Sequence, residues 1–531
     1  MNFAWSFGRQ KSAAAADDCT PAAAEGQAPR QDQHSASDHD HARGVYPLYF
    51  LANIAARASM LVVLIVLTRL LPAAEYGLFA LVVTVGEILE MGSSNWVRVY
   101  LLRTEAGVHK TRPRQLGRAL LLSAGGTVAA LAASMIVVPF VSAERTGEMM
   151  LAVVIYVAAF ALLRTTLMLA QLSRSHVPYA VIETARALAV VAATIIFARL
   201  YPHSFFPASL ALSLATAVCA GLGLLLARSL HMRAILPRGG YLAALSFGVP
   251  FLLANCLAYA IGWSDRFVLN YFLGPAAVGV YVAAYSIARQ PVELFVGALN
   301  TFTFPLLVQA YAADGSRKAG PIQSGLMITI ATLGIGIVAG LSLTAEPLAT
   351  LLFPPSYRAE VAMLIPWIAT ATFILSIKQF IFDNGLHVTQ QNWPHLFTMM
   401  PTVLISIGLG IALVGRYGIF GAAINYVVVA TVAACASAIF SFRVLSFAIP
   451  WGTLGRAALS ALIATSATWA MIHHSRFGII GTLVAAVIVF CSVYGALLTA
   501  SGFSLWRMIE TPWVPLRRHA QADRISSNSV S

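Results

Sequence analysis

The sequence predicts an all-α polytopic membrane protein with about 14 transmembrane helices. Only 10% of the 531 residues are charged and 59% are hydrophobic, whereas soluble domains carry roughly 25% charged residues. From about Val45 to Trp506 the chain is a succession of apolar segments, each at or above the roughly 20 residues that a helix needs to cross a bilayer. These segments do not alternate apolar and polar residues, as the strands of a membrane barrel would.

Turn residues separate the predicted helices. Pro72, the Gly274-Pro275 pair and the Pro354-Pro355 pair mark three of the breaks, and Gly315 and Gly418 mark two more. We expect helices over 46–71, 77–102, 118–142, 148–173, 177–199, 206–230, 243–273, 276–310, 320–352, 360–388, 395–415, 418–442, 454–473 and 478–505.

These segments group into larger parts. The first residues are rich in Ala, Asp, Gln, His and Ser, which is typical of a disordered tail. We expect such a cytoplasmic tail over 1–44, an N-lobe of six helices over 45–232, a C-lobe of six helices over 233–445, two further helices over 446–506, and a cytoplasmic tail over 507–531.

The Lys and Arg residues of the predicted loops indicate the orientation. The even-numbered loops and the C-terminal tail hold seventeen of them, and the odd-numbered loops hold six. Because Lys and Arg residues stay on the cytoplasmic side, both termini are predicted to be cytoplasmic. The membrane that we expect is the inner membrane of the cell. The net charge of +13 therefore reflects topology, and we expect no nucleic-acid partner.

One stretch of the sequence recurs. Leu71 to Ala80 follows the first predicted helix and Leu273 to Val282 follows the seventh. In each copy a Gly stands six residues after the Leu and an aromatic residue two after the Gly. An even number of helices separates the copies, which indicates a parallel repeat with a binding site between two lobes. Two similar tight turns arising by chance remain the alternative.

Charged side chains inside the apolar segments are the candidates for a site. A charge at the bilayer centre costs a few kcal/mol, so such residues usually face a bundle interior or a water-filled cavity. We expect a cationic lumen whose guanidinium and ammonium groups bind phosphate or carboxylate groups of a substrate. Its candidates are Arg57, Arg98, Arg164, Arg289 and Lys378. For each, a structural ion pair or a side chain that reaches an interface is the alternative.

Buried carboxylates could couple transport to an ion gradient. The candidates are Asp265, Glu293 and Asp383. Glu293 lies four residues after Arg289, on the same helix face, so a local ion pair competes with this role. Asp265 is followed by Arg266, and adjacent helical residues point to different faces.

No pattern indicates an enzyme, a cofactor or a metal site. The five cysteines are isolated and lack metal-ligand spacing. Phosphate-binding Gly-rich loops and nucleophile elbows are absent as well. We therefore expect no catalytic residues, no cofactor and no bound metal.

The repeat and its surroundings contain three motifs. They are Leu67-Thr68-Arg69-Leu70-Leu71-Pro72-Ala73-Ala74-Glu75-Tyr76-Gly77-Leu78-Phe79, then Glu90-Met91-Gly92 with the later Arg98, and then Asp265 to Gly274 with Gly279-Val280-Tyr281. In this order and spacing they resemble the bacterial polysaccharide-export flippases of the multidrug/oligosaccharidyl-lipid/polysaccharide superfamily. The resemblance covers about 45 to 445, and the last two predicted helices exceed the family's common twelve.

The resemblance implies two six-helix lobes that alternate between inward- and outward-open states. It implies a lipid-diphosphate-linked oligosaccharide as substrate, flipped across the inner membrane for exopolysaccharide, capsule or O-antigen (lipopolysaccharide) biosynthesis. Membrane lipids surround such a protein, and a polysaccharide polymerase and glycosyltransferases are its expected partners. Two alternatives remain open: a multidrug exporter of the same superfamily, and an integral-membrane polysaccharide polymerase or ligase.

Overall fold

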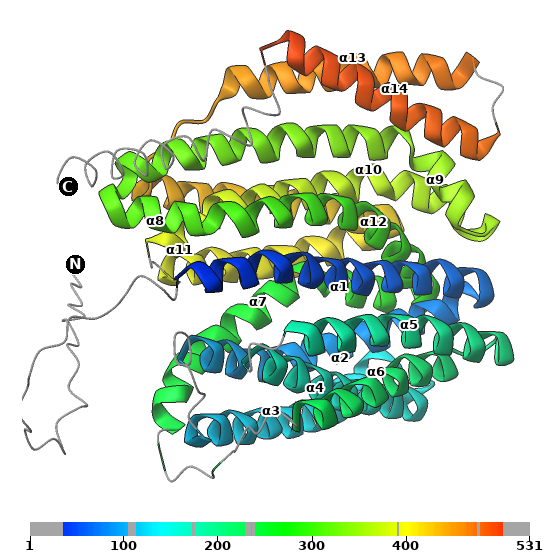
Figure 1. Ribbon diagram of the computed structural model, residues 1–531. Helices are drawn as coiled ribbons and strands as arrows, with labels where there is room; N and C mark the ends of the chain where they lie inside the picture. The colour runs from blue at the N-terminus through cyan, green and yellow to red at the C-terminus, as the bar shows by residue number, and fades with distance from the viewer. Residues whose placement is uncertain are drawn as a thin grey trace, which may run out of the picture. The chain divides into compact units, whose positions relative to one another are not determined.

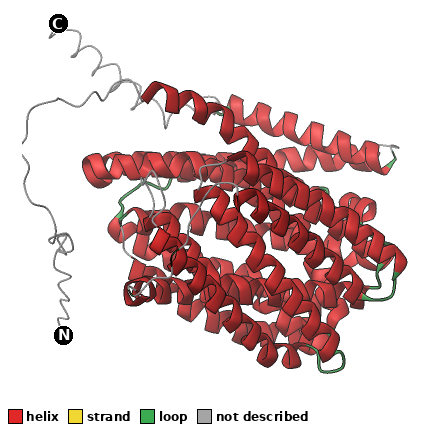
Figure 2. Ribbon diagram, turned by 60° about the horizontal axis from the view of Figure 1, so that its bottom comes forward, coloured by secondary structure: helices red, strands yellow, loops and turns green. Residues whose placement is uncertain are grey.

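The all-helical membrane fold predicted from the sequence is confirmed. The computed structural model describes residues 35–104, 113–172, 176–228, 235, 239, 241–389, 392–474 and 478–502, and these contain helices and no strand (Figure 2). Ten helices within these ranges are long and apolar enough to cross a membrane. The number of fourteen spans stays a prediction.

The chain divides into two compact units, Met1–Leu48 and Tyr49–Ser531. In the first, only residues from Ser35 onward are described, and they belong to α1 (Ser35–Leu70). Helix α1 therefore includes residues 35–44 of the predicted tail, and the boundary at residue 44 stays a prediction.

Five helices of the first half of the chain pack on one another. They are α2 (Ala73–Thr104), α3 (Pro113–Val141), α4 (Thr146–Leu172), α5 (His176–Leu200) and α6 (Phe205–Arg228). Helix α2 contacts α3, α4 and α6, and α6 also packs against α4 and α5 (Figure 1). We call α2–α6 the first-half helices.

The second-half helices are α7 to α12, and a π-helical turn interrupts them. They are α7 (Tyr241–Leu273), α8 (Pro275–Leu343), α9 (Ala345–Leu352), α10 (Pro355–Ile377), the π-helix η1 (Lys378–Phe382), α11 (Asp383–Val388) and α12 (Asn392–Val444). Gly315 in α8 and Gly418 in α12 have φ of 53° and 61°, a conformation that favours glycine. Each breaks its helix where the sequence predicted a turn.

Two more helices follow, α13 (Trp451–His474) and α14 (Ile479–Ala500). They pack on each other, and α13 also packs on α8 (Figure 1). Their outer faces expose large apolar side chains such as Leu462 and Ile488. In a protein that crosses a bilayer, such faces are lipid contacts rather than sites of aggregation.

The two copies of the repeat contact each other at the first turns of α2 and α8. Gly77 faces the Pro275 carbonyl so closely that a Cβ there would overlap it. Reciprocally, a Cβ on Gly279 would lie 2.7 Å from the Ala73 carbonyl oxygen. Gly77 and Gly279 are equivalent in the repeat, as are Ala73 and Pro275. The repeat is therefore the surface through which the two halves of the chain meet at this end.

Candidate functional site

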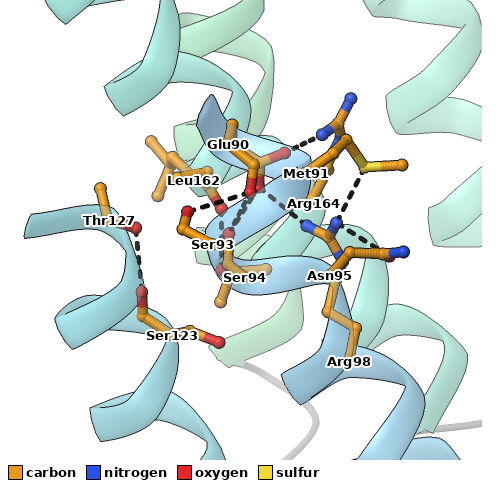
Figure 3. Close-up of polar contacts among 12 residues, drawn as sticks. Glu90, Met91, Ser93, Ser94, Asn95, Arg98, Ser123, Thr127, Leu162 and Arg164 are labelled. Carbon is orange, nitrogen blue, oxygen red and sulfur yellow. Dashed lines mark hydrogen bonds and ion pairs between the residues drawn. The ribbon is translucent and has the colours of Figure 1, made fainter. Parts of the chain in front are cut away.

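A cluster of four charged side chains joins α2 to α4, and Figure 3 shows three of them, Glu90, Arg98 and Arg164. Arg98 Nη1 lies 2.9 Å from Glu90 Oε1, and Arg164 Nη2 lies 2.5 Å from Glu87 Oε2. Arg164 also forms an ion pair with Glu90 through its other terminal nitrogen. Two predicted substrate residues thus share one cluster, which we call the first-half cluster: Glu87, Glu90, Arg98 and Arg164.

Neutral donors and acceptors surround this cluster. Ser94 Oγ donates to Glu90 Oε1 over 3.0 Å, and the Tyr156 hydroxyl donates to Glu87 Oε1 over 2.9 Å. Arg98 Nη2 donates to Asn95 Oδ1 over 3.1 Å. Glu90 is fully buried, while the side chains of Arg98 and Arg164 are 12% and 18% exposed. Because two carboxylates balance two guanidinium groups, the cluster holds its charges in apolar surroundings without a net charge.

A second ion pair lies on α8. Arg289 Nε contacts Glu293 Oε1 at 2.6 Å, and both side chains are about one-third exposed. The guanidinium also hydrogen-bonds the Tyr285 hydroxyl and lies 5.2 Å from the centre of that ring. The local pair expected from the four-residue spacing is therefore present, in a partly accessible place.

A third pair spans the π-helix η1. Lys378 Nζ lies 2.6 Å from Asp383 Oδ2, and Ser437 Oγ of α12 donates to Asp383 Oδ1 over 2.8 Å. In an α-helix, residues five apart point about 140° away from each other. A π-helix bonds residue i to i+5, which turns both side chains to one side. Sequence spacing gave no sign of this pair.

Asp265 and Arg266 of α7 contact different neighbours, as adjacent helical residues should. Asp265 accepts hydrogen bonds from Asn425 Nδ2 at 2.7 Å and from the Tyr281 hydroxyl at 3.1 Å. Arg266 Nη1 donates to Thr84 Oγ1 of α2 over 2.5 Å. The carboxylate thus belongs to the second-half helices, and the guanidinium connects them to the first half.

Arg57 is set apart from the other candidates. It is exposed on α1, and no described side chain hydrogen-bonds to it or pairs with it. The structure therefore brings Arg98 and Arg164 into one cluster and pairs Lys378 with Asp383 and Arg289 with Glu293.

A cavity of about 750 Å³ lies elsewhere, where α8 and α9 meet α13 and α14. Its lining includes Glu346, Trp469 and His473, and none of the predicted site residues. Among the described residues, no group of three or more His, Cys, Asp or Glu side chains could hold a metal ion.

Comparison with protein families gives one match. Residues 47–311 match the family described as "Polysaccharide biosynthesis protein". This range contains both copies of the repeat, the first-half cluster and Asp265. A search of curated proteins found no match.

Solved structures show the same fold at low sequence identity. A lipid II flippase, MurJ, in an inward closed conformation matches with a TM-score of 0.65 at 11% identity, over 86% of this chain and 98% of that one. An inward-facing multidrug resistance MATE transporter of the MOP superfamily matches with a TM-score of 0.60 at 14% identity, over 73% and 94%. A MOP superfamily transporter from Pyrococcus furiosus, whose binding pocket has reverse polarity, gives 0.54 at 15% identity, over 75% and 94%.

Proposed function

We propose that this chain, which belongs to the polysaccharide biosynthesis protein family and has the fold of MOP superfamily transporters, flips a lipid-diphosphate-linked oligosaccharide across the inner membrane. The flipped unit would serve exopolysaccharide, capsule or O-antigen (lipopolysaccharide) synthesis. The observation that carries the proposal is the first-half cluster, in which two arginines lie inside a helical membrane bundle beside carboxylates.

An exchange of anions explains how such a cluster would work. A diphosphate offers the guanidinium groups of Arg98 and Arg164 the same forked hydrogen bonds that Glu87 and Glu90 provide. Arg289, whose carboxylate partner is partly exposed, could bind a second phosphate oxygen or an acidic sugar in the same way. Arg57 would add positive charge along the path, and Lys378 would do so where its ion pair with Asp383 opens. The apolar lipid tail would meanwhile stay among the bilayer lipids.

Coupling to an ion gradient would use a carboxylate that gains and loses charge. Asp265, Glu293 and Asp383 are the candidates, and two of them already have a cationic partner. Asp265 instead accepts hydrogen bonds from the neutral donors Asn425 and Tyr281. The negative charge of its carboxylate is therefore the least compensated of the three and would attract a proton or a metal cation most strongly. We therefore place the coupling role first at Asp265.

The alternatives fit these contacts less well. A multidrug exporter of organic cations would use unpaired carboxylates, whereas Glu87, Glu90 and Glu293 each pair with an arginine. A polymerase or ligase would need catalytic side chains outside the membrane, and the loops between the described helices are short. On these grounds transport is favoured over catalysis. A polymerase and glycosyltransferases would then be partners in the same pathway.

Transport in proteoliposomes tests the proposal. Purified protein is reconstituted with a fluorescent prenyl-diphosphate oligosaccharide, and a reagent that destroys only outward-facing label reports flipping. We expect flipping by the wild type and at least tenfold slower flipping by Arg98→Ala. Arg199→Ala, which removes an exposed arginine at the end of α5, is the matched control. Transport of organic cations without any flipping would favour the multidrug alternative and overturn the proposal.

A further inference from the structure

We propose that Tyr259 and Trp263 of α7 form a stacking surface for the sugar rings next to the diphosphate. This inference rests on the proposed function and extends it to the part of the substrate that distinguishes one repeat unit from another. We call the two residues the aromatic pair. Neither was among the residues that the sequence pattern singled out.

The aromatic pair presents two neighbouring rings on one helix face. Tyr259 and Trp263 are four residues apart, their ring centroids lie 4.9 Å apart, and the ring planes are inclined by 40°. Both residues are half-buried, so part of each ring is packed and part is accessible. Arg266, three residues beyond Trp263, lies on the same face.

This face of α7 is turned toward α2. Arg266 donates to Thr84, and the Sγ of Cys256 lies 3.5 Å from where a Cβ of Gly92 would be. Residue numbers thus rise along one helix as they fall along the other, so α2 and α7 run antiparallel. In that register Tyr259 lies level with Glu90, in the first-half cluster.

Tyr259 is near charged groups of both halves. It lies within electrostatic range of Glu87, Arg98 and Arg164, and of Arg289 of α8. A diphosphate held by these arginines would therefore have Tyr259 as a neighbour. The first sugar, which is bonded directly to that diphosphate, would come next to the aromatic pair.

A buried guanidinium holds Trp263 in place. Arg266 is 8% exposed, lies 5.2 Å from the ring centres of both Trp263 and Tyr285, and forms no ion pair with a described residue. Arg289 approaches the same Tyr285 ring at 5.2 Å. These contacts form a series in which aromatic rings and guanidinium groups alternate: Trp263, Arg266, Tyr285 and Arg289. The cation–π contacts fix the orientations of the two rings.

Sugar chemistry matches this arrangement. One face of a pyranose ring carries mainly C–H groups and packs on an aromatic ring, while its hydroxyl groups need hydrogen-bond partners. Tyrosine and tryptophan provide a broad apolar surface together with a polar group at the ring edge. The arginines would bind the diphosphate shared by all such substrates, and the aromatic pair would contact the variable sugar.

Binding of two probes to the full-length protein in nanodiscs tests this inference. The probes are farnesyl diphosphate and farnesyl diphosphate carrying an N-acetylglucosamine disaccharide. For Tyr259→Ala and Trp263→Ala we expect at least tenfold weaker binding of the sugar-bearing probe and less than twofold change for farnesyl diphosphate. Tyr259→Phe and Trp263→Phe should restore most of the affinity. Trp469→Ala, which removes an exposed tryptophan of α13, is the matched control and should bind both probes normally.

Each other outcome has a distinct meaning. Equal losses for both probes would show that the aromatic pair only supports the helix, and unchanged binding of both would show that it does not contact sugar. Either result overturns this inference and leaves the proposed function standing. A wild-type protein that binds neither probe would instead overturn the proposed function.

Discussion

Lys378 and Asp383 form an ion pair of 2.6 Å between residues that an ordinary α-helix would turn away from each other. The π-helical turn from Lys378 to Phe382 makes the pair possible. Both side chains are less than 10% exposed, so each provides the countercharge that the other needs. The π-helical turn is therefore what allows the charges of Lys378 and Asp383 to neutralise each other inside the second-half helices.

Removing one member of this pair should destabilise the protein. Asp383→Asn leaves a buried ammonium group without its anion, and breaking a buried pair costs about 3–5 kcal/mol. We expect a clearly lower midpoint of thermal unfolding in detergent. The double variant Lys378→Met/Asp383→Leu, which removes both charges, should recover most of the loss. A double variant as unstable as Asp383→Asn would show that the charges are not coupled.

Arg57 and Arg289 should matter for transport more than for folding. Arg57 is exposed, and Arg289 belongs to a pair that is one-third exposed, a setting in which ion pairs contribute about 0–1 kcal/mol. Arg57→Ala and Arg289→Ala should therefore abolish polysaccharide export at normal membrane levels, as measured by surface polysaccharide and immunoblotting. Normal export by both variants would remove them from the path, and loss of both proteins from the membrane would assign them a structural role.

Asp265→Asn should uncouple flipping from the ion gradient. The amide keeps the size of the side chain. Its oxygen can still accept from Asn425 and its NH2 can donate to the Tyr281 hydroxyl, but it cannot ionise. We expect gradient-driven flipping in proteoliposomes to fall at least tenfold, while binding of the lipid-linked substrate changes little. If the variant keeps the wild-type dependence on pH or Na⁺, Asp265 has no part in coupling.

The contact between the repeat copies should not tolerate a methyl group. Gly77→Ala places a Cβ against the Pro275 carbonyl, a backbone atom that cannot rotate away, and overpacking of this kind costs roughly 1–3 kcal/mol. We expect a lower thermal midpoint and separation of α2 from α8, measured by crosslinking of cysteines placed in their first turns. Gly125→Ala, with no atom within 4 Å of the new Cβ, is the control and should leave both measurements unchanged.

Labelling of single cysteines tests the predicted orientation. A cysteine in place of Thr104 or Ser316 should be protected from an impermeant reagent added outside intact cells. A cysteine in place of Pro354 should react. Reaction at the first two positions would reverse the predicted topology.

The sequence predicted those contacts that depend on one helix alone. Arg289 and Glu293 pair as their spacing indicated, and Asp265 and Arg266 diverge as adjacent residues should. The pairs of Arg164 with Glu87 and Glu90 could not be predicted, because periodicity defines the face of a helix but not its neighbour. The Lys378–Asp383 pair was missed because a change of helical pitch leaves no periodic signal.

The reciprocal contact of Gly77 with Pro275 and of Gly279 with Ala73 also bears on the origin of the chain. Two equivalent turns that pack on each other have the self-complementary geometry of a twofold homodimer. Tandem duplication of a gene whose product dimerised through this turn would give such a chain in one step. In a homodimer, one substitution changes both copies of the turn, but after fusion it changes only one of them. The two halves could then diverge elsewhere, while the turns of Gly77 and Gly279 would have to stay complementary to each other.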